Sequence, residues 1–491
     1  MCTPKTKAEI RIEFVYLLII AVLITFPYFL TRKTPPGYII GGDTLVHAAI
    51  ARGISLGRNP FIDQTYGVYP NWYPFLYHLL VATVSKGFHV SIETAMVALQ
   101  AGFAVLMAIT FFHVARTIWD GISGITAMAL SLMLLTSHLY PNPKELAPIF
   151  GILFVLYFVK ERWITSGIVL GLGLWTHYAS LFPLLATPIF IAVILRKKEA
   201  LIPVVVSSVT FLPFFINVIL HAQHIFPQVE DIYAFWRTDT MTKQVSSLIP
   251  SLYSVPFLLL SLLKWHKNRD FGATVVIAAI GTIWGLRVSP TALRSLGIQL
   301  WSARFVVLLP YMYILLGAYG FSGLKMDSSK TKTLFVLTIL LLIPLASSLH
   351  FWNSVKSDKF VWVSNYDLSY YFPQEHFVEV SEWIRTHSSR DDVIATSEEA
   401  GMMLNALTGR PIVATLYGHG NTFLNNDARR RDLRTLFTGS CNEKREVVDR
   451  YNVRYIILEQ FVYEHWQLRD IGCIAHPVYK IDNVTIMEVK R

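Results

Sequence analysis

Long apolar runs alternate with short polar segments over the first 350 residues of the chain. A membrane-spanning helix needs about 20 mostly apolar residues. The pattern predicts eleven spans, several of them short, at about residues 13–31, 93–115, 121–137, 146–159, 163–176, 180–195, 201–220, 249–263, 271–286, 305–324 and 333–349. Residues 72–84 are apolar but brief and contain His78, so we predict an interfacial helix there, not a span.

Composition supports this interpretation. The chain is 53% hydrophobic and only 15% charged, and its mean hydropathy is +0.45. A soluble protein of this length carries more charge. We therefore predict a polytopic α-helical membrane domain over residues 1–350, whose first outer loop (32–91) is unusually long.

The pattern changes in the last 141 residues. Residues 351–491 contain no apolar run of span length and carry 17 Lys and Arg against 19 Asp and Glu. Runs of β-branched residues bounded by turn residues predict strands, and the segments between them have the periodicity of helices. We predict a soluble α/β domain with strands at 391–396, 410–415, 453–459 and 484–489 and helices at about 375–387, 397–407 and 443–451.

The net charge of +10 is distributed in an ordered way. With a cytoplasmic N-terminus and eleven spans, every second loop is basic, for example Arg196–Lys198 and Lys264–Arg269. This bias predicts a cell-membrane protein with an extracytoplasmic C-terminal domain. The same bias accounts for the positive net charge, so we predict no nucleic-acid partner. We interpret the basic cluster at residues 429–434 (RRRDLR) as a solvated helix face.

Ionisable residues gather at the predicted outer face, where desolvation makes them costly. Asp43 and His47 stand one helical turn apart just after the first span, Glu145 begins the fourth, and Arg294 and Arg304 precede the tenth. Each has a simpler interpretation. Asp43 could cap a helix and His47 could pack in a core. Glu145 could complement a helix dipole, and Arg304 could anchor at the interface.

Two further sets of residues stand on this side. Tyr69, Trp72, Tyr73 and His78 could contact a sugar or an acceptor, or form an interfacial aromatic belt. Cys441 and Cys473 could form a disulfide, which the sequence does not decide.

In order and spacing, these segments resemble the GT-C superfamily of membrane glycosyltransferases, most nearly the catalytic subunit of oligosaccharyltransferases. Asp43 in GGDTLVH resembles the first acidic motif, and HLYPNPKE, with Glu145, stands in place of the second. SARFVVLLPYMYILLG, with Arg304, resembles the segment that meets the lipid-linked phosphate. EKREVVDRYNVRYIILEQ resembles an element of the outer domain.

The resemblance implies an inverting transfer from a polyprenyl (dolichyl) phosphate-linked sugar to an acceptor glycan, lipid or protein at the outer face, next to membrane lipid. Asp43 would act as general base, His47 and Glu145 as its helpers, and Arg304 and Arg294 as phosphate ligands. Mg²⁺ or Mn²⁺ is the one cofactor that this pattern suggests, and Asp43 and Glu145 would be its ligands.

The sequence departs from oligosaccharyltransferases in two places. It lacks their Trp-Trp-Asp-Tyr-Gly signature, where it has residues 396–415 instead, and its second motif offers the single acid Glu145. Both departures favour a lipid-phosphate monosaccharide donor and transfer without a tightly held metal. The alternative is a transporter or flippase for a lipid-linked or anionic substrate, which predicts ionisable residues at mid-membrane depth and two similar halves.

Overall fold

The computed structural model describes residues 42–67, 69–131, 134, 142–221, 241–250, 254–294, 302–323, 374–421 and 423–490. The chain divides into two compact units. Unit 1 holds the described residues within 97–212 and 239–360, and unit 2 holds those within 36–96, 213–238 and 361–491. The predicted spans at 13–31 and 333–349 lie outside the described residues.

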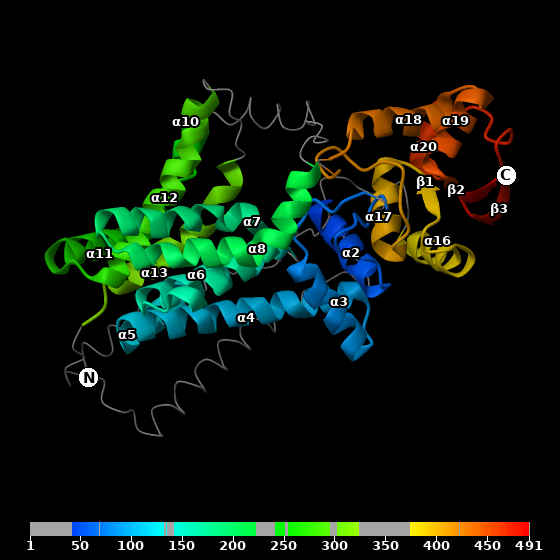
Figure 1. Ribbon diagram of the computed structural model, residues 1–491. Helices are drawn as coiled ribbons and strands as arrows, with labels where there is room; N and C mark the ends of the chain where they lie inside the picture. Colours follow the sequence, from blue (N-terminus) through cyan, green and yellow to red (C-terminus); the bar gives the residue numbers. More distant parts are fainter. Residues whose placement is uncertain are drawn as a thin grey trace. The chain divides into compact units, whose positions relative to one another are not determined.

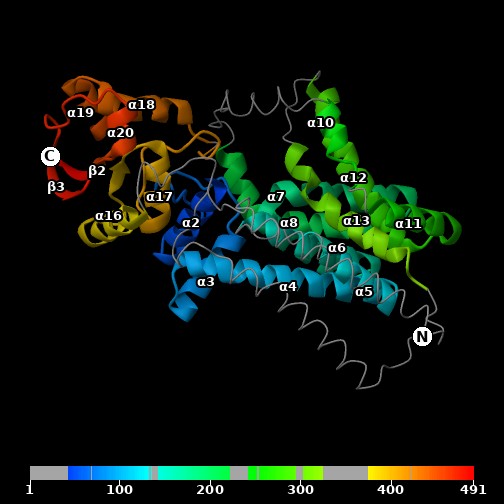
Figure 2. The ribbon, with the colours of Figure 1, turned by 180° about the vertical axis from the view of Figure 1, so that it is seen from behind.

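Unit 1 is helical throughout its described part. Its helices α6, α7 and α13 lie side by side in both views (Figures 1 and 2). The bounds are α4 (Ile92–Ile118, whose first turns belong to unit 2), α5 (Gly121–Ser131), η2 (Pro143–Glu145), α6 (Ala147–Val159), α7 (Trp163–Ile194), η3 (Lys198–Leu201), α8 (Ile202–His221, whose last turns belong to unit 2), α10 (Met241–Ser246), α11 (Val255–Asn268), α12 (Phe271–Arg294), η6 (Ser302–Leu308) and α13 (Leu309–Tyr319).

Four of the described helical stretches are long and apolar enough to cross a membrane: Ile92–Ile118, Trp163–Ile194, Lys198–Asn217 and Phe271–Ser289. Shorter apolar helices occupy Gly121–Ser131 and Arg304–Tyr319. The chain is thus a helical membrane protein, as its hydropathy predicts, while the total of eleven spans stays a prediction.

The turn predicted at His177 between two spans is present inside α7. Glu161 just before this helix pairs with Lys197 just after it at 2.5 Å, so the chain reverses direction within α7. The His177 backbone is non-helical (φ −157°, ψ 84°), and its Nδ1 accepts from the Ser180 backbone N–H at 3.2 Å. Two helical segments therefore meet at His177, where the imidazole caps the second of them.

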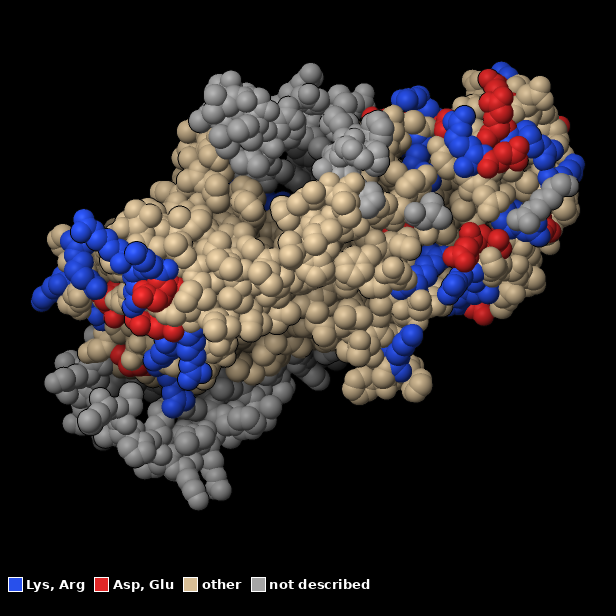
Figure 3. Space-filling model, viewed as in Figure 1, with Lys and Arg blue, Asp and Glu red and all other residues tan. Residues whose placement is uncertain are grey.

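The predicted cytoplasmic loops meet at one end of unit 1. Trp119 Nε1 donates to Asp270 Oδ1 at 2.9 Å, and Lys197 Nζ pairs with Glu161 Oε1 at 2.5 Å. Lys264 donates to the Ser322 carbonyl. Figure 3 shows Lys and Arg gathered at this end. Five loops that the charge pattern assigns to one side are therefore neighbours in space, although their side of the membrane is still a prediction.

Unit 2 combines the segment after the first predicted span with the C-terminal domain. The first segment contributes α2 (Gly42–Ser55) and α3 (Leu76–Phe88), the latter at the predicted interfacial helix. The C-terminal domain contains α16 (Gln374–His387), β1 (Val393–Ala395), α17 (Glu398–Thr408), α18 (Asn426–Thr438), α19 (Cys441–Tyr451), β2 (Val453–Leu458), α20 (Gln460–His465), β3 (Ala475–Ile481) and β4 (Val484–Val489).

The four strands form one mixed sheet in the order β1-β2-β4-β3. β1 and β2 are parallel, whereas β4 is antiparallel to both β2 and β3. The predicted helices agree with α16, α17 and α19, and the RRRDLR segment lies in α18. Residue types explain their ends: Ser440 and Glu443 form a capping box before α19, and Asn452 ends it with φ 51°.

The strand predicted at 410–415 is wrong, and β3 was not predicted. Segment 410–415 makes only an isolated bridge, Ile394 to Ile412. The reason lies on the side that faces β1. The Ile394 N–H donates to the Pro411 carbonyl at 2.9 Å, but Pro411 has no N–H to donate in return. The Val413 carbonyl, which would continue the ladder, accepts from the Arg429 side chain at 2.7 Å instead.

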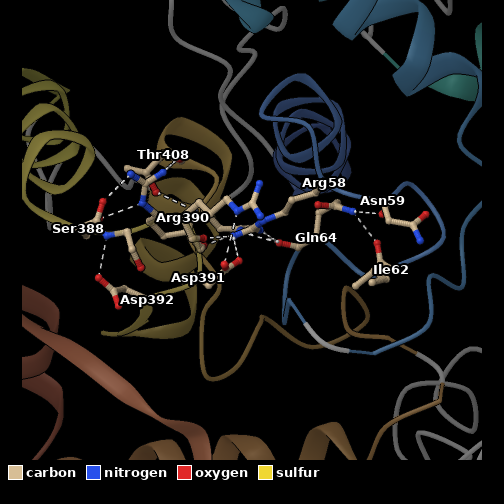
Figure 4. Close-up of polar contacts among 12 residues, drawn as sticks. Arg58, Asn59, Ile62, Gln64, Ser388, Arg390, Asp391, Asp392 and Thr408 are labelled. Atoms are coloured by element: carbon tan, nitrogen blue, oxygen red, sulfur yellow. Dashed lines mark hydrogen bonds and ion pairs between the residues drawn. The ribbon is translucent and has the colours of Figure 1, made fainter.

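Several contacts tie the first segment to the C-terminal domain. Arg58 donates to the Arg390 carbonyl and pairs with Asp391 at 3.5 Å, as Figure 4 shows. Gly67 has φ 82°, and a Cβ there would stand 2.9 Å from Pro411, so glycine permits this close approach. Within the C-terminal domain, Cys441 and Cys473 form a disulfide. Unit 2 is therefore assembled from chain segments far apart in sequence.

Candidate active site

Helix α2 presents Asp43 in its first turn. The residues that follow are almost all buried, including Leu45, Ala48 and Ala51, so the helix is fixed by packing on most of its surface. The predicted helix is confirmed, but it begins at Gly42, so Asp43 belongs to its first turn and does not precede it. The Asp43 side chain remains 45% exposed, which leaves its carboxylate within reach of a substrate.

A histidine from the C-terminal domain contacts this carboxylate. His419 Nε2 lies 3.3 Å from Asp43 Oδ1. The other ring nitrogen, Nδ1, lies 2.9 Å from the Tyr417 carbonyl oxygen. Since a carbonyl only accepts hydrogen bonds, Nδ1 carries a proton and donates it there. Two segments 376 positions apart in sequence thus meet at Asp43.

The loop that carries His419 is anchored to the first segment. Asn421 Nδ2 donates to Asp63 Oδ2 at 2.6 Å and to the Pro70 carbonyl at 2.8 Å. Asp63 also accepts from the Thr65 N–H at 2.7 Å. Burial raises the pKa of Asp63, and these hydrogen bonds oppose the shift. The loop is therefore held at a point two residues beyond His419.

His47 lies deeper in unit 2 than Asp43. It is buried, and its Nδ1 stands 3.0 Å from Nε2 of His78, which is fully buried. Burial, and then the neighbouring His47, lower the pKa of His78 well below its usual value. The Tyr73 ring meets His47 edge-on at 5.1 Å. The two histidines thus link α2 to α3 inside an aromatic cluster.

Three of the four predicted sugar contacts belong to one aromatic cluster. Trp72 and Tyr73 are half-buried and meet edge-on at 5.5 Å, and Tyr73 meets His78 edge-on at 5.7 Å. The Tyr69 ring lies 5.5 Å from the Arg429 guanidinium. His78 offers no face to a sugar because it is fully buried, so Trp72 and Tyr73 are the stronger candidates of the four.

The remaining predicted residues belong to unit 1. Glu145 ends η2 and is buried at the start of α6, and Asn142 caps this turn by accepting from the Lys144 N–H. Arg304 lies in η6 and has a Coulombic interaction with Tyr178. Arg294 is the last residue of α12, and its side chain lies outside the described part. The structure therefore brings together Asp43 and His419, and separately His47, Tyr73 and His78.

The fold has solved counterparts. No family model and no curated protein sequence matches the chain. The structure is similar to ArnT from Cupriavidus metallidurans bound to undecaprenyl phosphate, with a TM-score of 0.60 and 10% identity, covering 96% of this chain and 97% of that one. It is also similar to the Archaeoglobus fulgidus oligosaccharyltransferase in complex with Zn and sulfate, with a TM-score of 0.57 and 15% identity over 90% and 67% of the two chains. The fold is GT-C-like.

A third neighbour extends the comparison. The arabinofuranosyltransferase AftD from Mycobacteria has a TM-score of 0.54 and 14% identity, and the match covers 97% of this chain and 40% of that one. At such identities the comparison establishes the fold alone. The resemblance in motif order therefore gave the right fold, while the activity has to be argued from residues.

The GT-C-like unit 1 contains an apolar pocket of about 290 Å³. Residues of α11, η6 and α13 line it, among them Phe257, Val306, Leu309 and Tyr313, together with Ser247. Arg287 Nε donates to Ser247 Oγ at 3.0 Å and is itself buried. The sequence predicts Arg287 in an outer loop, whereas the structure places it inside α12.

Within the described residues, no three His, Cys, Asp or Glu side chains form a group suited to a metal ion. Asp43 and Glu145 belong to different units, so a cation shared between them stays a prediction.

The sequence analysis missed His419, and it placed Arg287 in an outer loop with Arg294 and Arg304 without giving it a role. Arg287 had a signal, since an Arg beside an apolar run is a functional candidate by default. His419 had a weaker one: it stands between two glycines in a loop of the C-terminal domain.

Proposed function

We propose that the protein transfers a sugar from a polyprenyl phosphate-linked donor to an acceptor hydroxyl at the outer face of the membrane, with inversion. The observation that carries the proposal is Asp43, an accessible carboxylate fixed at the start of a packed helix in a GT-C-like fold. Two structural neighbours, ArnT and the oligosaccharyltransferase, have been solved with undecaprenyl phosphate and with a dolichol-phosphate, respectively.

In the proposed reaction, Asp43 accepts the proton of the acceptor hydroxyl as that oxygen forms a bond to the anomeric carbon. The bond between the anomeric carbon and the phosphate oxygen breaks on the opposite side, and the polyprenyl phosphate leaves with the electron pair. General-base assistance is worth about 10²–10⁴ in rate. Charge on the leaving phosphate is stabilised by a cation at the membrane surface, for which Arg304 and Arg294 are candidates.

Other residues have supporting roles in this proposal. The apolar pocket of unit 1 suits part of a prenyl chain, and buried Arg287 beside Ser247 is a further phosphate candidate. His47 acts through His78 to fix α2, and Trp72 with Tyr73 offers faces on which a sugar can stack. Glu145 orients the acceptor, and a divalent cation is not required by the reaction as written.

The test is sugar transfer in membranes that contain the full chain, with a panel of radiolabelled polyprenyl-phosphate sugars. Asp43→Asn keeps the shape of the side chain but cannot take the proton, so we expect turnover to fall about 10²-fold or more with donor binding nearly intact. Arg304→Ala should weaken donor binding as well, because it removes a phosphate partner.

The matched control is Asp482→Asn, in the β3–β4 turn, whose side chain is 71% exposed. It should transfer at the wild-type rate. If Asp43→Asn also transfers at the wild-type rate, Asp43 has a structural role only, and it leaves the mechanism.

A further inference from the structure

We propose that His419 is a positioning residue for Asp43: it holds one carboxylate oxygen so that the other faces the acceptor hydroxyl. The inference rests on the proposed function, because it concerns the carboxylate that we assign as the base. It adds to that function a residue from the C-terminal domain, contributed by a loop far from Asp43 in the sequence.

The partners of the two ring nitrogens define the role of His419. Nδ1–H donates to the Tyr417 carbonyl at 2.9 Å, so this nitrogen cannot also accept a proton from a substrate. Nε2 faces Asp43 Oδ1 at 3.3 Å. Because Nδ1 already holds one ring proton, a hydrogen bond to Oδ1 requires a second proton on Nε2, so the pair forms with His419 as the imidazolium. His419 thus bridges two acceptors by means of its two nitrogens.

This arrangement distinguishes the base from its supporting residue. In a His–Asp pair that uses histidine as the base, one ring nitrogen contacts the carboxylate and the other contacts the reacting hydroxyl. In this protein the second nitrogen is bonded to the backbone. The Asp43 side chain is also the more accessible, at 45% exposed against 21% for His419. The acceptor therefore meets the carboxylate, and His419 orients it.

The anchoring of the loop supports a positioning role. Asn421, two residues beyond His419, is buried and bonded to both Asp63 and the Pro70 carbonyl. Asn426 Nδ2 donates to the Asn421 carbonyl at 2.8 Å, which closes the loop on itself. A side chain on so constrained a backbone can fix its partner within the tolerance that catalysis needs.

During the proposed reaction His419 neither gains nor loses a proton. With Oδ1 held by Nε2–H, the proton of the acceptor hydroxyl passes to Oδ2, and the new carbon–oxygen bond forms at the anomeric carbon as the phosphate leaves. Losing the orientation of a catalytic group by about 1 Å can lower a rate about 10²-fold. The effect should fall on turnover and not on donor affinity, since His419 contacts neither the phosphate nor the sugar in this scheme.

The contact itself can be tested without any activity. We would place cysteines at 43 and 419 (Asp43→Cys with His419→Cys) in the full chain with Cys2→Ser. Dibromobimane becomes fluorescent on joining two neighbouring thiols. We expect fluorescence from the double variant and none from either single variant, which serve as controls. No fluorescence from the double variant would refute the contact and the proposal with it.

The role is tested by kinetics of the intact enzyme. We expect His419→Ala to lower kcat about 10- to 100-fold with KM changed less than about 3-fold. His419→Gln keeps an N–H donor toward Asp43 and should recover most of kcat. If the role of His419 were purely structural, kcat would fall to the same extent in His419→Ala and His419→Gln. Unchanged kcat in His419→Ala overturns this inference alone, whereas a wild-type protein without transfer overturns the proposed function and this role together.

Discussion

Buried carboxyl groups show how the fold of unit 2 sets the chemistry of single residues. Asp63 has Asn421 and the Thr65 N–H as donors. Glu459 is only 1% exposed, and its carboxylate accepts from the Phe461 N–H as the cap of α20. Burial raises the pKa of Glu459 to about 7, and Glu399 adds to the shift while Ser397 opposes it. Such a group titrates near neutral pH although it belongs to the packing of the domain.

Glu459 should make the stability of the protein depend on pH. Its pKa rises from 4.5 in the unfolded chain to about 7 in the folded one, so the folded protein holds this proton more tightly. Stability is therefore greatest below pH 4.5 as far as this group is concerned, and it falls as the pH rises to about 7. The resulting loss in the free energy of unfolding is at most about 3 kcal/mol, because a pKa difference of one unit corresponds to about 1.36 kcal/mol.

Unfolding of the full chain in detergent, followed by tryptophan fluorescence at pH 5.5 and pH 8, measures this effect. Glu459→Gln should flatten the dependence, and what remains is due to other groups such as Asp63, Glu398 and Glu399, whose pKa values burial also raises. Glu446→Gln, at an exposed position of α19, should retain the wild-type dependence. A Glu459→Gln protein that loses as much stability with rising pH as the wild type would contradict the assignment.

Among the elements, α2 is the one that joins the two parts of unit 2. Arg52, in its last turn, donates from Nε to the Ala406 carbonyl of α17 at 2.5 Å. The same guanidinium pairs with Glu93, in the first turn of α4. Gly409, at the end of α17 with φ 71°, lets that helix approach α2: a Cβ there would stand 2.8 Å from Leu56. Three helices thus converge on Arg52. This arginine lies ten residues after the first residue of α2, the helix whose first turn bears Asp43.

Removing Arg52 should destabilise unit 2. Arg52→Met leaves the buried carboxylate of Glu93 without its cation, and we expect a loss of about 3–5 kcal/mol in the free energy of unfolding. The double variant Arg52→Met with Glu93→Met removes both charges and should recover most of the loss. Lys86→Met, at an exposed position of α3, is the control. Unfolding by denaturant is the measurement, and a double variant no more stable than Arg52→Met would argue against the ion pair as the cause.

For the whole molecule, the charge pattern predicts the arrangement across the membrane. The basic loops of unit 1 meet at one end, and the C-terminal domain has a disulfide, which is typical of proteins outside the cytoplasm. Both observations agree with a cytoplasmic N-terminus and an extracytoplasmic C-terminal domain.

Cysteine labelling of intact cells tests this topology. In the Cys2→Ser background, Ser389→Cys should react with an impermeant thiol reagent, because it is exposed in the C-terminal domain. Lys198→Cys, exposed at the basic end of unit 1, should react only after the cells are permeabilised. The reverse pattern would place the basic loops outside and would remove Asp43 from the outer face.

The sequence by itself determined the features that depend on local pattern. Hydropathy located α4, α6, α8 and α12, because a span is a property of consecutive residues. Alternation and turn residues located β2 and β4, and helix signals located α16, α17 and α19. The motif order around Asp43 and Arg304 also indicated the GT-C-like fold.

Tertiary structure alone decided which distant segments meet. The strand predicted at 410–415 is missing in part because the Val413 carbonyl bonds to the Arg429 side chain, a partner that no local pattern reveals. The disulfide Cys441–Cys473 required geometry for the same reason. His419 reaches Asp43 only because Asn421 ties its loop to Asp63, and a contact across 376 positions leaves no periodic trace in a single sequence.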